Sequence, residues 1–432
     1  MTNATLNIIA SDLWGTTFRF LLVLLPIVVP VMLFYAFWVI RFRWVIMKFV
    51  DAQKPCLLEI RLPKEITKSP AAMEIFFSHL NQGGAKNWGE AFFDGKTRPW
   101  FSCELVSTGG VVRFFIWSSQ AKFKNLIETQ LYGQYPNLEI FEAEDYTKDF
   151  FYDPEKYSMY ALQFALSKPD PFPIKTYIDY GLSEDQKEEY KIDPITSVIE
   201  YLGSMKKGEN AWIQILLQKH EKEGFFHGNL GEPKDLKKEV QTEIDKIKKS
   251  TIPEGDDDKV FKFPNPTKGQ QAVIAALERS YTKTAYDCMI RGIYIPEKES
   301  FNGINIGAMI GSFKQYGSQD LNSFRPGILA DVDDWRKDYG RIFPFYQKAI
   351  DNEIASIKKN LLYAYKLRSY FQWPYKNYHP PYLFGDKFTK PFVLTTEELA
   401  TIFHFPSGLV SQTPTLQRVS SKKSEAPSNL PI

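Results

Sequence analysis

The chain has 432 residues, of which 44% are hydrophobic and 15% aromatic, enough for two or three compact domains with cores of their own. Its 53 lysines and arginines against 51 aspartates and glutamates give a formal net charge of +2, so the protein is not the polycation that favours sequence-independent binding to nucleic acid. The cysteines Cys56, Cys103 and Cys288 lie far apart and form no CxxC pair, which argues against a zinc site or a disulfide framework and suits a reducing compartment.

One charge-free hydrophobic run near the N-terminus predicts a transmembrane helix. Residues 20–40 read FLLVLLPIVVPVMLFYAFWVI, and at about 1.5 Å per residue they cross a hydrocarbon core of about 30 Å. A cleaved signal peptide would have a shorter apolar core followed by small residues, whereas here Arg41-Phe42-Arg43-Trp44 comes next. We therefore expect a membrane helix with its interface over residues 18–44, preceded by a short extracytoplasmic tail over residues 1–17.

The charges that flank this run predict its orientation. Arg41, Arg43 and Lys48 follow it closely, whereas Asp12 and Arg19 are the only charged side chains before it. Loops that carry such an excess of Lys and Arg stay on the cytoplasmic side of a membrane. The sequence therefore predicts a single-pass protein of the cell membrane, in contact with the lipid bilayer, whose C-terminal bulk is cytoplasmic.

Residues 56–146 carry the elements of a ferredoxin-like domain. These elements are, in chain order, a strand over 57–62, a helix starting at Ser69-Pro70, a hairpin through Thr108-Gly109-Gly110, a helix over 120–132 and a strand over 138–142. Their order, βαββαβ, predicts an α+β fold in which two helices cover one face of an antiparallel sheet.

Residues 157–330 predict a second α+β domain that repeats this topology with additions. Its expected elements are strands over 159–166, 212–218 and 285–295, a helix starting at Asp193-Pro194, and helices over 269–281 and 304–316. Within it, residues 221–262 are rich in Lys, Glu and Asp and include a charged helix over 234–249. Because the charges alternate in sign, we interpret this segment as a solvated helical insertion rather than a nucleic-acid surface.

Residues 331–406 predict a helical C-terminal part. A long helix is expected over 345–370, and the capping box Thr395-Thr396-Glu397-Glu398 predicts a short helix after it. The composition of residues 407–432, poor in large apolar residues and rich in Ser, Thr, Pro and Lys, predicts a flexible, linker-like tail.

The end of the long helix interleaves basic and aromatic side chains, a mixture that can stack on bases and pair with phosphates. The candidates for contact with single-stranded nucleic acid are Lys358, Lys359, Tyr363, Tyr365, Lys366 and Arg368. The alternative is a helix that lies against the sheet, with the stems of its basic side chains on apolar surface and their charges in solvent.

No motif of a known catalytic type is found. GxxxxGK[ST] and HExxH are absent, no GxGxxG follows a strand, and no GxSxG occurs, so we expect no enzyme activity, cofactor or metal. His220 and His227 lie on a charged loop and form only a weak metal pair. Asp331, Asp333 and Asp334 resemble a calcium-binding loop but lack the glycine and the downstream glutamate of an EF-hand.

Three stretches together carry a resemblance to a known family. They are residues 57–73 with 131–146, residues 212–218 (WIQILLQ), and residues 394–432. This combination resembles the membrane-anchored N-terminal region of type IV secretion and conjugation coupling ATPases of the TraG-like class, in the form typical of candidate-phyla bacteria. The resemblance extends over nearly the whole chain and is one of pattern, without a catalytic signature. In that family the region leads into a domain whose Walker A motif binds ATP and that moves DNA or protein across the envelope.

The resemblance implies a platform rather than a motor. The sequence reaches Pro431-Ile432 where the ATPase domain of this family would begin, so no catalytic residue is carried over. Either the motor is a separate polypeptide or the chain is a paralogue that serves as an adaptor. We expect a non-catalytic, membrane-anchored component that docks a cytoplasmic ATPase in trans, with further copies of itself as another expected partner and DNA at most an indirect one. The alternative is a membrane-tethered protein that binds single-stranded nucleic acid.

Overall fold

The computed structural model describes residues 3–63, 66, 68–84, 87–148, 150–183, 192–221, 235–251, 264–329, 344–371, 391–406 and 418–419. The chain divides into two compact units, the first formed by Met1–Ala52 with Ala85–Thr97 and the second by Gln53–Gly84 with Arg98–Ile432.

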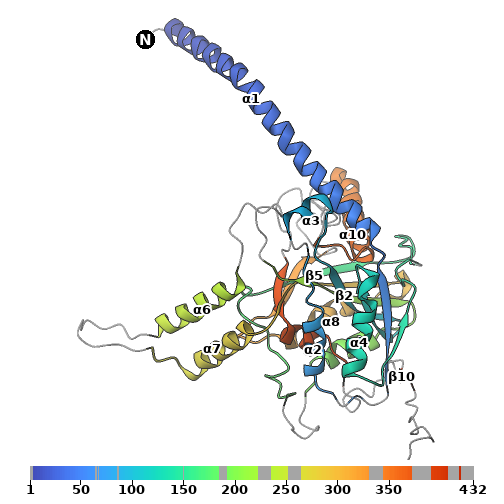
Figure 1. The fold of residues 1–432 in the computed structure, drawn as a ribbon. Coiled ribbons are helices and arrows are strands. Elements are labelled where there is room, and N and C mark those ends of the chain that lie inside the picture. Colours follow the sequence, from blue (N-terminus) through green and yellow to red (C-terminus); the bar gives the residue numbers. More distant parts are fainter. Residues whose placement is uncertain are drawn as a thin grey trace, which may run out of the picture. The chain divides into compact units, whose positions relative to one another are not determined.

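The first unit consists of the long helix α1 (Asn3–Ala52) and the short helix α3 (Trp88–Phe93) (Figure 1). Over Leu24–Ala52, α1 is long and apolar enough to cross a membrane, as expected, and it is the only such helix in the described part of the chain. Residues 3–17, expected as a tail ahead of the membrane, belong to the same helix. Helix α3 was not expected, because it has only six residues and its start is marked by a single cap, the side chain of Asn87.

The second unit is built on one ten-stranded sheet with the order β10-β1-β3-β2-β6-β7-β5-β8, in which β4 also pairs with β1 and β9 with β7. All of these pairings are antiparallel except the short one between β1 and β10. The strands are β1 (Cys56–Pro63), β2 (Trp100–Thr108), β3 (Val111–Ser118), β4 (Glu139–Glu142), β5 (Tyr160–Leu166), β6 (Glu209–Lys219), β7 (Ala285–Pro296), β8 (Phe324–Leu329), β9 (Phe392–Thr395) and β10 (Arg418–Val419).

The first half of the sheet contains the elements predicted for residues 56–146. Helix α2 (Ala71–His79) begins after Ser69-Pro70, and helix α4 (Lys124–Gln134) follows β3 through a 3-10 turn. The hairpin between β2 and β3 turns at Gly109 and Gly110, whose φ angles of 57° and 87° are in the left-handed region that glycine tolerates. The strand order in this half is β4-β1-β3-β2, with antiparallel neighbours throughout.

The second half follows the prediction less closely. Helices α5 (Ile195–Gly203) and α7 (Lys268–Tyr281) form as expected, but the helix expected over 304–316 is divided into α8 (Ile304–Gly311) and a 3-10 turn. Strand β8 was not expected. It is short, and Pro326 and Gly327 make it a poor strand by propensity; as a terminal strand of the sheet it tolerates them.

The C-terminal part is helical only in part, which corrects the expectation for residues 331–406. Helices α10 (Gln347–Lys366) and α11 (Thr396–Ile402) are present, but β9 lies between them in the chain and pairs with β7. The four residues of β9 are all buried, so a short apolar run gains both ladder hydrogen bonds and burial by joining the sheet. Within the tail expected over 407–432, Arg418–Val419 forms β10, and the remainder lies outside the described residues.

The two faces of the sheet differ in chemistry. One face carries the main hydrophobic core, in which alternate strand residues such as Phe101, Cys103 and Leu105 pack with α2, α4, α5, α8 and α11. The opposite face carries buried polar residues, including Ser102 and Glu104 on β2, and it packs against the end of α10.

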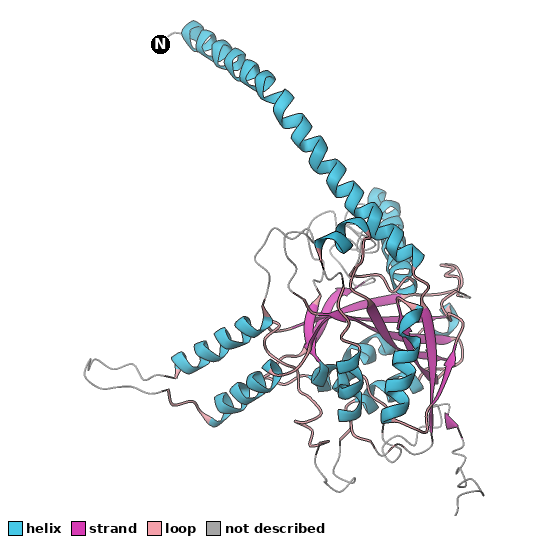
Figure 2. Ribbon diagram, in the orientation of Figure 1, coloured by secondary structure: helices cyan, strands magenta, loops and turns pink. Residues whose placement is uncertain are grey.

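The described part of the charged insertion contains one helix. Helix α6 (Leu236–Ser250) packs on α7 through an apolar cluster of its own, with Val240 and Ile244 facing Ile274 and Leu277. Figure 2 shows the two helices side by side, extending away from the sheet. The expected solvated helix is therefore confirmed for α6, while residues 222–234 and 252–263 lie outside the described part of the chain.

Candidate functional site

The first candidate site surrounds helix α11, an acidic helix that is buried along its whole length. The predicted capping box is confirmed: Thr395 accepts a hydrogen bond from the Glu398 amide, and the Glu398 carboxylate accepts one from the Thr395 amide at 2.8 Å. Both interactions satisfy amides at the start of the helix that have no partner within it.

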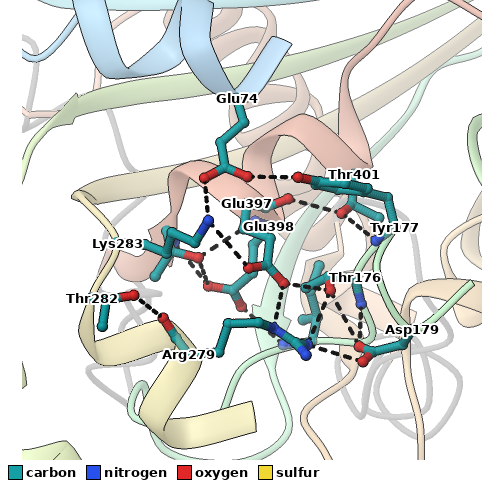
Figure 3. A network of polar contacts seen from close by, with 12 residues as sticks. Glu74, Thr176, Tyr177, Asp179, Arg279, Thr282, Lys283, Glu397, Glu398 and Thr401 are labelled. Atoms are coloured by element: carbon teal, nitrogen blue, oxygen red, sulfur yellow. Dashed lines mark hydrogen bonds and ion pairs between the residues drawn. The ribbon is translucent and has the colours of Figure 1, made fainter. Parts of the chain in front are cut away.

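Glu397 lies directly before Glu398 in the first turn of α11. Its carboxylate accepts hydrogen bonds from side chains of two other segments. Arg279 in the last turn of α7 donates to its Oε1 at 2.9 Å, and the Thr176 hydroxyl donates to the same atom at 2.6 Å. Arg279 also donates to Asp179 at 2.9 Å. The guanidinium therefore bridges two carboxylates, as Figure 3 shows.

A second cation extends the network towards α2. Lys283 lies 2.6 Å from Glu74 Oε1 and 3.8 Å from Glu397 Oε2. The Tyr177 hydroxyl donates to the other Glu74 oxygen at 2.8 Å, and burial together with this carboxylate raises the pKa of Tyr177. Three segments far apart in the chain, α2, residues 176–179 and residues 279–283, are thereby tied to α11 (Figure 3).

Glu398 has the most perturbed carboxyl of this network. Burial raises its pKa to about 7, although the amides of Thr395 and Ile174 and the Thr395 hydroxyl all donate to its carboxylate. Hydrogen bonds to a carboxylate favour the charged form, so desolvation outweighs them here.

His404, directly after α11, forms a further buried tie. Its Nδ1 lies 2.9 Å from the Ala400 carbonyl oxygen and its Nε2 lies 2.8 Å from Asp193 Oδ1. A carbonyl and a carboxylate only accept hydrogen bonds, so both ring nitrogens face acceptors. This pair joins the end of α11 to the start of α5.

The second candidate site lies on the other face of the sheet, around Arg368. Its Nε and Nη2 donate to the two Glu104 oxygens at 2.9 and 3.1 Å, and it also pairs with Asp145. Burial alone would lower the pKa of Arg368, but Glu104, Tyr146 and Asp145 raise it well above its usual value. Burial likewise opposes ionisation of Asp145, yet Arg368 lowers its pKa overall.

Arg291 lies on the same face of the sheet as Arg368, but its hydrogen bonding and the direction of its pKa shift are different. The strand registers place Gln163, Arg291, Gln214 and Glu104 in one row across β5, β7, β6 and β2. Arg291 is 2% exposed and donates to the Ser369 carbonyl oxygen, while its Nε and Nη1 have no hydrogen-bond partner among the described residues. Burial lowers the pKa of Arg291 to about 10.

A family model described as a domain of unknown function, DUF8128, matches residues 51–418. The chain belongs to the DUF8128 family. The match includes both polar networks and leaves most of α1 outside. A search of curated proteins finds no match to the sequence.

Within this DUF8128 chain the six predicted nucleic-acid contacts lie in different surroundings. Tyr365 and Arg368 are fully buried, and Lys366 is partly buried, with its Nζ 2.5 Å from the Phe150 carbonyl oxygen. Lys359 and Tyr363 are exposed and Lys358 is partly exposed. The interleaved pattern therefore has two structural roles: its last part enters the protein interior, and its first part lies on the surface of α10.

The described residues of this DUF8128 chain contain no group of three or more His, Cys, Asp or Glu side chains that could hold a metal ion. His220 Nδ1 lies 2.6 Å from Asp287, and Arg98 pairs with the same carboxylate. His227 and the aspartates at 331, 333 and 334 lie outside the described residues. The three cysteines are all buried, and burial raises their pKa values.

Sequence reasoning missed the partners that define both sites of this DUF8128 domain. Glu104 looked like a polar residue on an alternating strand, and Arg279 like the end of an amphipathic helix. Each partner lies more than 100 residues away in sequence, at Arg368 and Glu397, so no local pattern marks the pairs. The one local signal was the capping box, which identified α11 but not its burial.

Proposed function

We propose that this protein is a non-catalytic, membrane-anchored platform of a type IV secretion-like system, on which a cytoplasmic motor ATPase docks in trans. The observation that carries the proposal is the continuity of the sheet that follows the apolar helix in the chain. Strands β2 and β6 pair over nine positions and join both halves of the second unit into one sheet. A single continuous sheet of this kind would give a rigid binding surface for a motor that exerts force against the membrane.

The strand order supports a ferredoxin-like topology in each half. The order β4-β1-β3-β2 with antiparallel neighbours is the order of a split βαβ domain. The order β8-β5-β7-β6 repeats it, with α6 and α7 where the first half has a two-residue turn. We propose that the second unit consists of two copies of this topology, joined through their second strands.

The two polar networks, buried around Arg368 and partly buried around Arg279 and Lys283, support a mechanical role rather than chemistry. Arg279 and Lys283 each contact carboxylates from segments distant in the chain, and Arg368 does the same on the other face. Breaking a buried ion pair by removing one partner is strongly destabilising, so such ties hold the segments in one arrangement.

In the proposed orientation the second unit is cytoplasmic, because Arg41, Arg43 and Lys48 follow the charge-free run. A second copy of the chain is a further proposed partner. The alternative of single-stranded nucleic-acid binding has less support, because Tyr365 and Arg368 are buried and engaged within the protein.

Cross-linking in the source cells tests the proposal. A photo-reactive amino acid replaces an exposed tyrosine of the full chain at Tyr132 on α4 or at Tyr281 at the end of α7. We expect adducts with an ATPase that contains a Walker A motif, from at least one position. Adducts confined to nucleic acid, or to copies of the chain alone, would contradict a motor platform. A fluorescent protein fused after Ile432, which matures only in the cytoplasm, tests the orientation separately.

A further inference from the structure

Helix α3 packs on α1 at the end of the charge-free run. The ring of Phe92 stacks on that of Trp38 with centroids 4.4 Å apart, and Trp38 in turn contacts Phe34 on α1. Trp38 lies two residues before Ile40, the last residue of the run, which is about 3 Å along a helix axis. Whatever layer surrounds this turn of α1 therefore also surrounds α3.

A glycine fixes the segment after α3 against the same helix. Gly95 has φ 66°, and a Cβ there would lie 2.5 Å from the Val45 carbonyl oxygen. No real side chain tolerates such a contact without movement of the backbone. Residues 92–95 thus follow α1 from Trp38 to Val45, about 10 Å along its axis.

The side chains along this stretch combine aromatic and basic groups. Trp44 and Phe93 are 50% and 62% exposed. Arg41 and Lys48 lie over the Trp44 ring, with charge-to-centroid distances of 5.4 and 5.5 Å. Exposed aromatic rings next to basic side chains are typical of the interfacial layer of a bilayer, about 5–7 Å thick on each side of the hydrocarbon.

We propose that residues 87–97 are a second membrane-contacting element, which lies in the lipid headgroup layer beside α1 with Phe93 among the upper acyl chains. This inference rests on the proposed membrane anchoring. The occupant is lipid because α3 packs on the anchor itself, at the level where an apolar surface gives way to a basic one.

Fluorescence quenching in vesicles tests the position of Phe93. The full chain is reconstituted into vesicles of phosphatidylcholine with a minority of phosphatidylglycerol. Each sample carries an environment-sensitive fluorescent label on one introduced cysteine. The three variants are Phe93→Cys, Met32→Cys in the charge-free run, and Phe301→Cys in the second unit. The native cysteines are buried and react slowly. We expect lipids with a nitroxide near the headgroup to quench the label at position 93, and lipids with a nitroxide deep in the acyl chain to quench the label at position 32. Iodide in the buffer should quench the label at position 93 several-fold less than the label at position 301.

The outcomes separate the inference from the anchoring on which it rests. If iodide quenches positions 93 and 301 equally while deep nitroxides still quench position 32, the anchor stands and the inference is wrong. If the label at position 93 is protected from both iodide and nitroxides, protein covers it and the inference is also wrong. If deep nitroxides fail to quench position 32, the anchoring itself is wrong and the inference falls with it. Gly95→Val, combined with Phe93→Cys, is expected to restore quenching by iodide without affecting position 32.

Discussion

Arg368 and Glu104 form a bidentate ion pair in the protein interior, although 264 residues separate them in sequence. Neither side chain is more than 1% exposed. Arg368 is also the only non-glycine residue in the described part of the chain with a positive φ, at 48°. This backbone conformation directly after a helix usually takes glycine or asparagine, and for other residues it costs about 1–2 kcal/mol. The ion pairs of the side chain offset that cost.

Arg368→Met is expected to destabilise the protein by about 3–5 kcal/mol, because Glu104 then remains buried without its cation. The double variant Glu104→Gln with Arg368→Met should recover part of this loss, because the fully buried charge of Glu104 is also removed and only Asp145, 18% exposed, loses its cation. Urea denaturation of the full chain in detergent, followed by tryptophan fluorescence, measures both. Equal losses for the single and the double variant would contradict a specific pair.

Arg291→Met is the matched variant on the same face, and its expected effect is opposite. Arg291 is buried, and in the described part of the chain two of its nitrogen donors have no partner, so its replacement by an apolar side chain should be neutral or stabilise the fold by about 1–2 kcal/mol. The same denaturation experiment applies. A loss as large as that of Arg368→Met would contradict this expectation and mean that the contact of Arg291 with the Ser369 carbonyl oxygen is strongly stabilising.

Glu398 predicts a specific dependence of stability on pH. Its pKa is raised from 4.5 to about 7 in the folded protein, so its stabilising contribution is complete below pH 4.5 and is lost as the pH rises through 7. The full loss is on the order of 3 kcal/mol. Glu398→Gln keeps an acceptor for the capping box and does not titrate. Between these pH limits the unmodified chain should therefore lose more stability than the variant, by this amount; parallel pH profiles would contradict the shift.

Arg279→Gln should cost about 2 kcal/mol, because it leaves Glu397, 2% exposed, with only Thr176 and the more distant Lys283. Lys246→Gln on α6 is the control, since Lys246 pairs with Glu243 at the surface and its side chain is 64% exposed. That change should cost less than about 0.5 kcal/mol. Similar melting temperatures for the two variants would argue against the network as a tie.

Gly110→Ala should destabilise the fold by at least about 2 kcal/mol, because position 110 has φ 87° and a Cβ there would lie 2.6 Å from the Met205 carbonyl oxygen. Gly133→Ala in α4 is the opposite case, with no atom within 4 Å of its Cβ. It should stabilise the protein by about 0.5–1 kcal/mol. Thermal unfolding by circular dichroism compares the two, and a stable Gly110→Ala variant would contradict the tight hairpin.

Local patterns predicted those parts of the fold that local chemistry determines. Ser69-Pro70 and the capping box at Thr395 marked helix starts, because a cap is a property of neighbouring residues. The alternating runs around Gly109 and Gly110 marked a hairpin for the same reason. The apolar run over residues 20–40 identified the one helix, among those that the structure describes, that is long and apolar enough to cross a membrane.

Elements that depend on distant partners were missed. Strand β9 has four residues and becomes a strand only because β7 offers a free edge to it. Helix α3 has its place because Phe92 meets Trp38, more than 50 residues earlier in the chain. The position of the basic and aromatic end of α10 also depends on distant partners. Its sequence alone fits a solvent-exposed surface equally well. Arg368 is buried because it pairs there with Glu104 and Asp145.

The junction between β2 and β6 also has a consequence during synthesis. When the ribosome has completed β3, the outer edge of β2 has no neighbour, because its partner β6 ends at Lys219, 111 residues after Thr108. At about 5–20 residues per second, the nascent chain carries an open, apolar strand edge for roughly 5–20 seconds. Such an edge is a template for pairing with other chains. In the proposed platform, α1 would hold the nascent chain at the membrane during that interval, away from free copies of the protein.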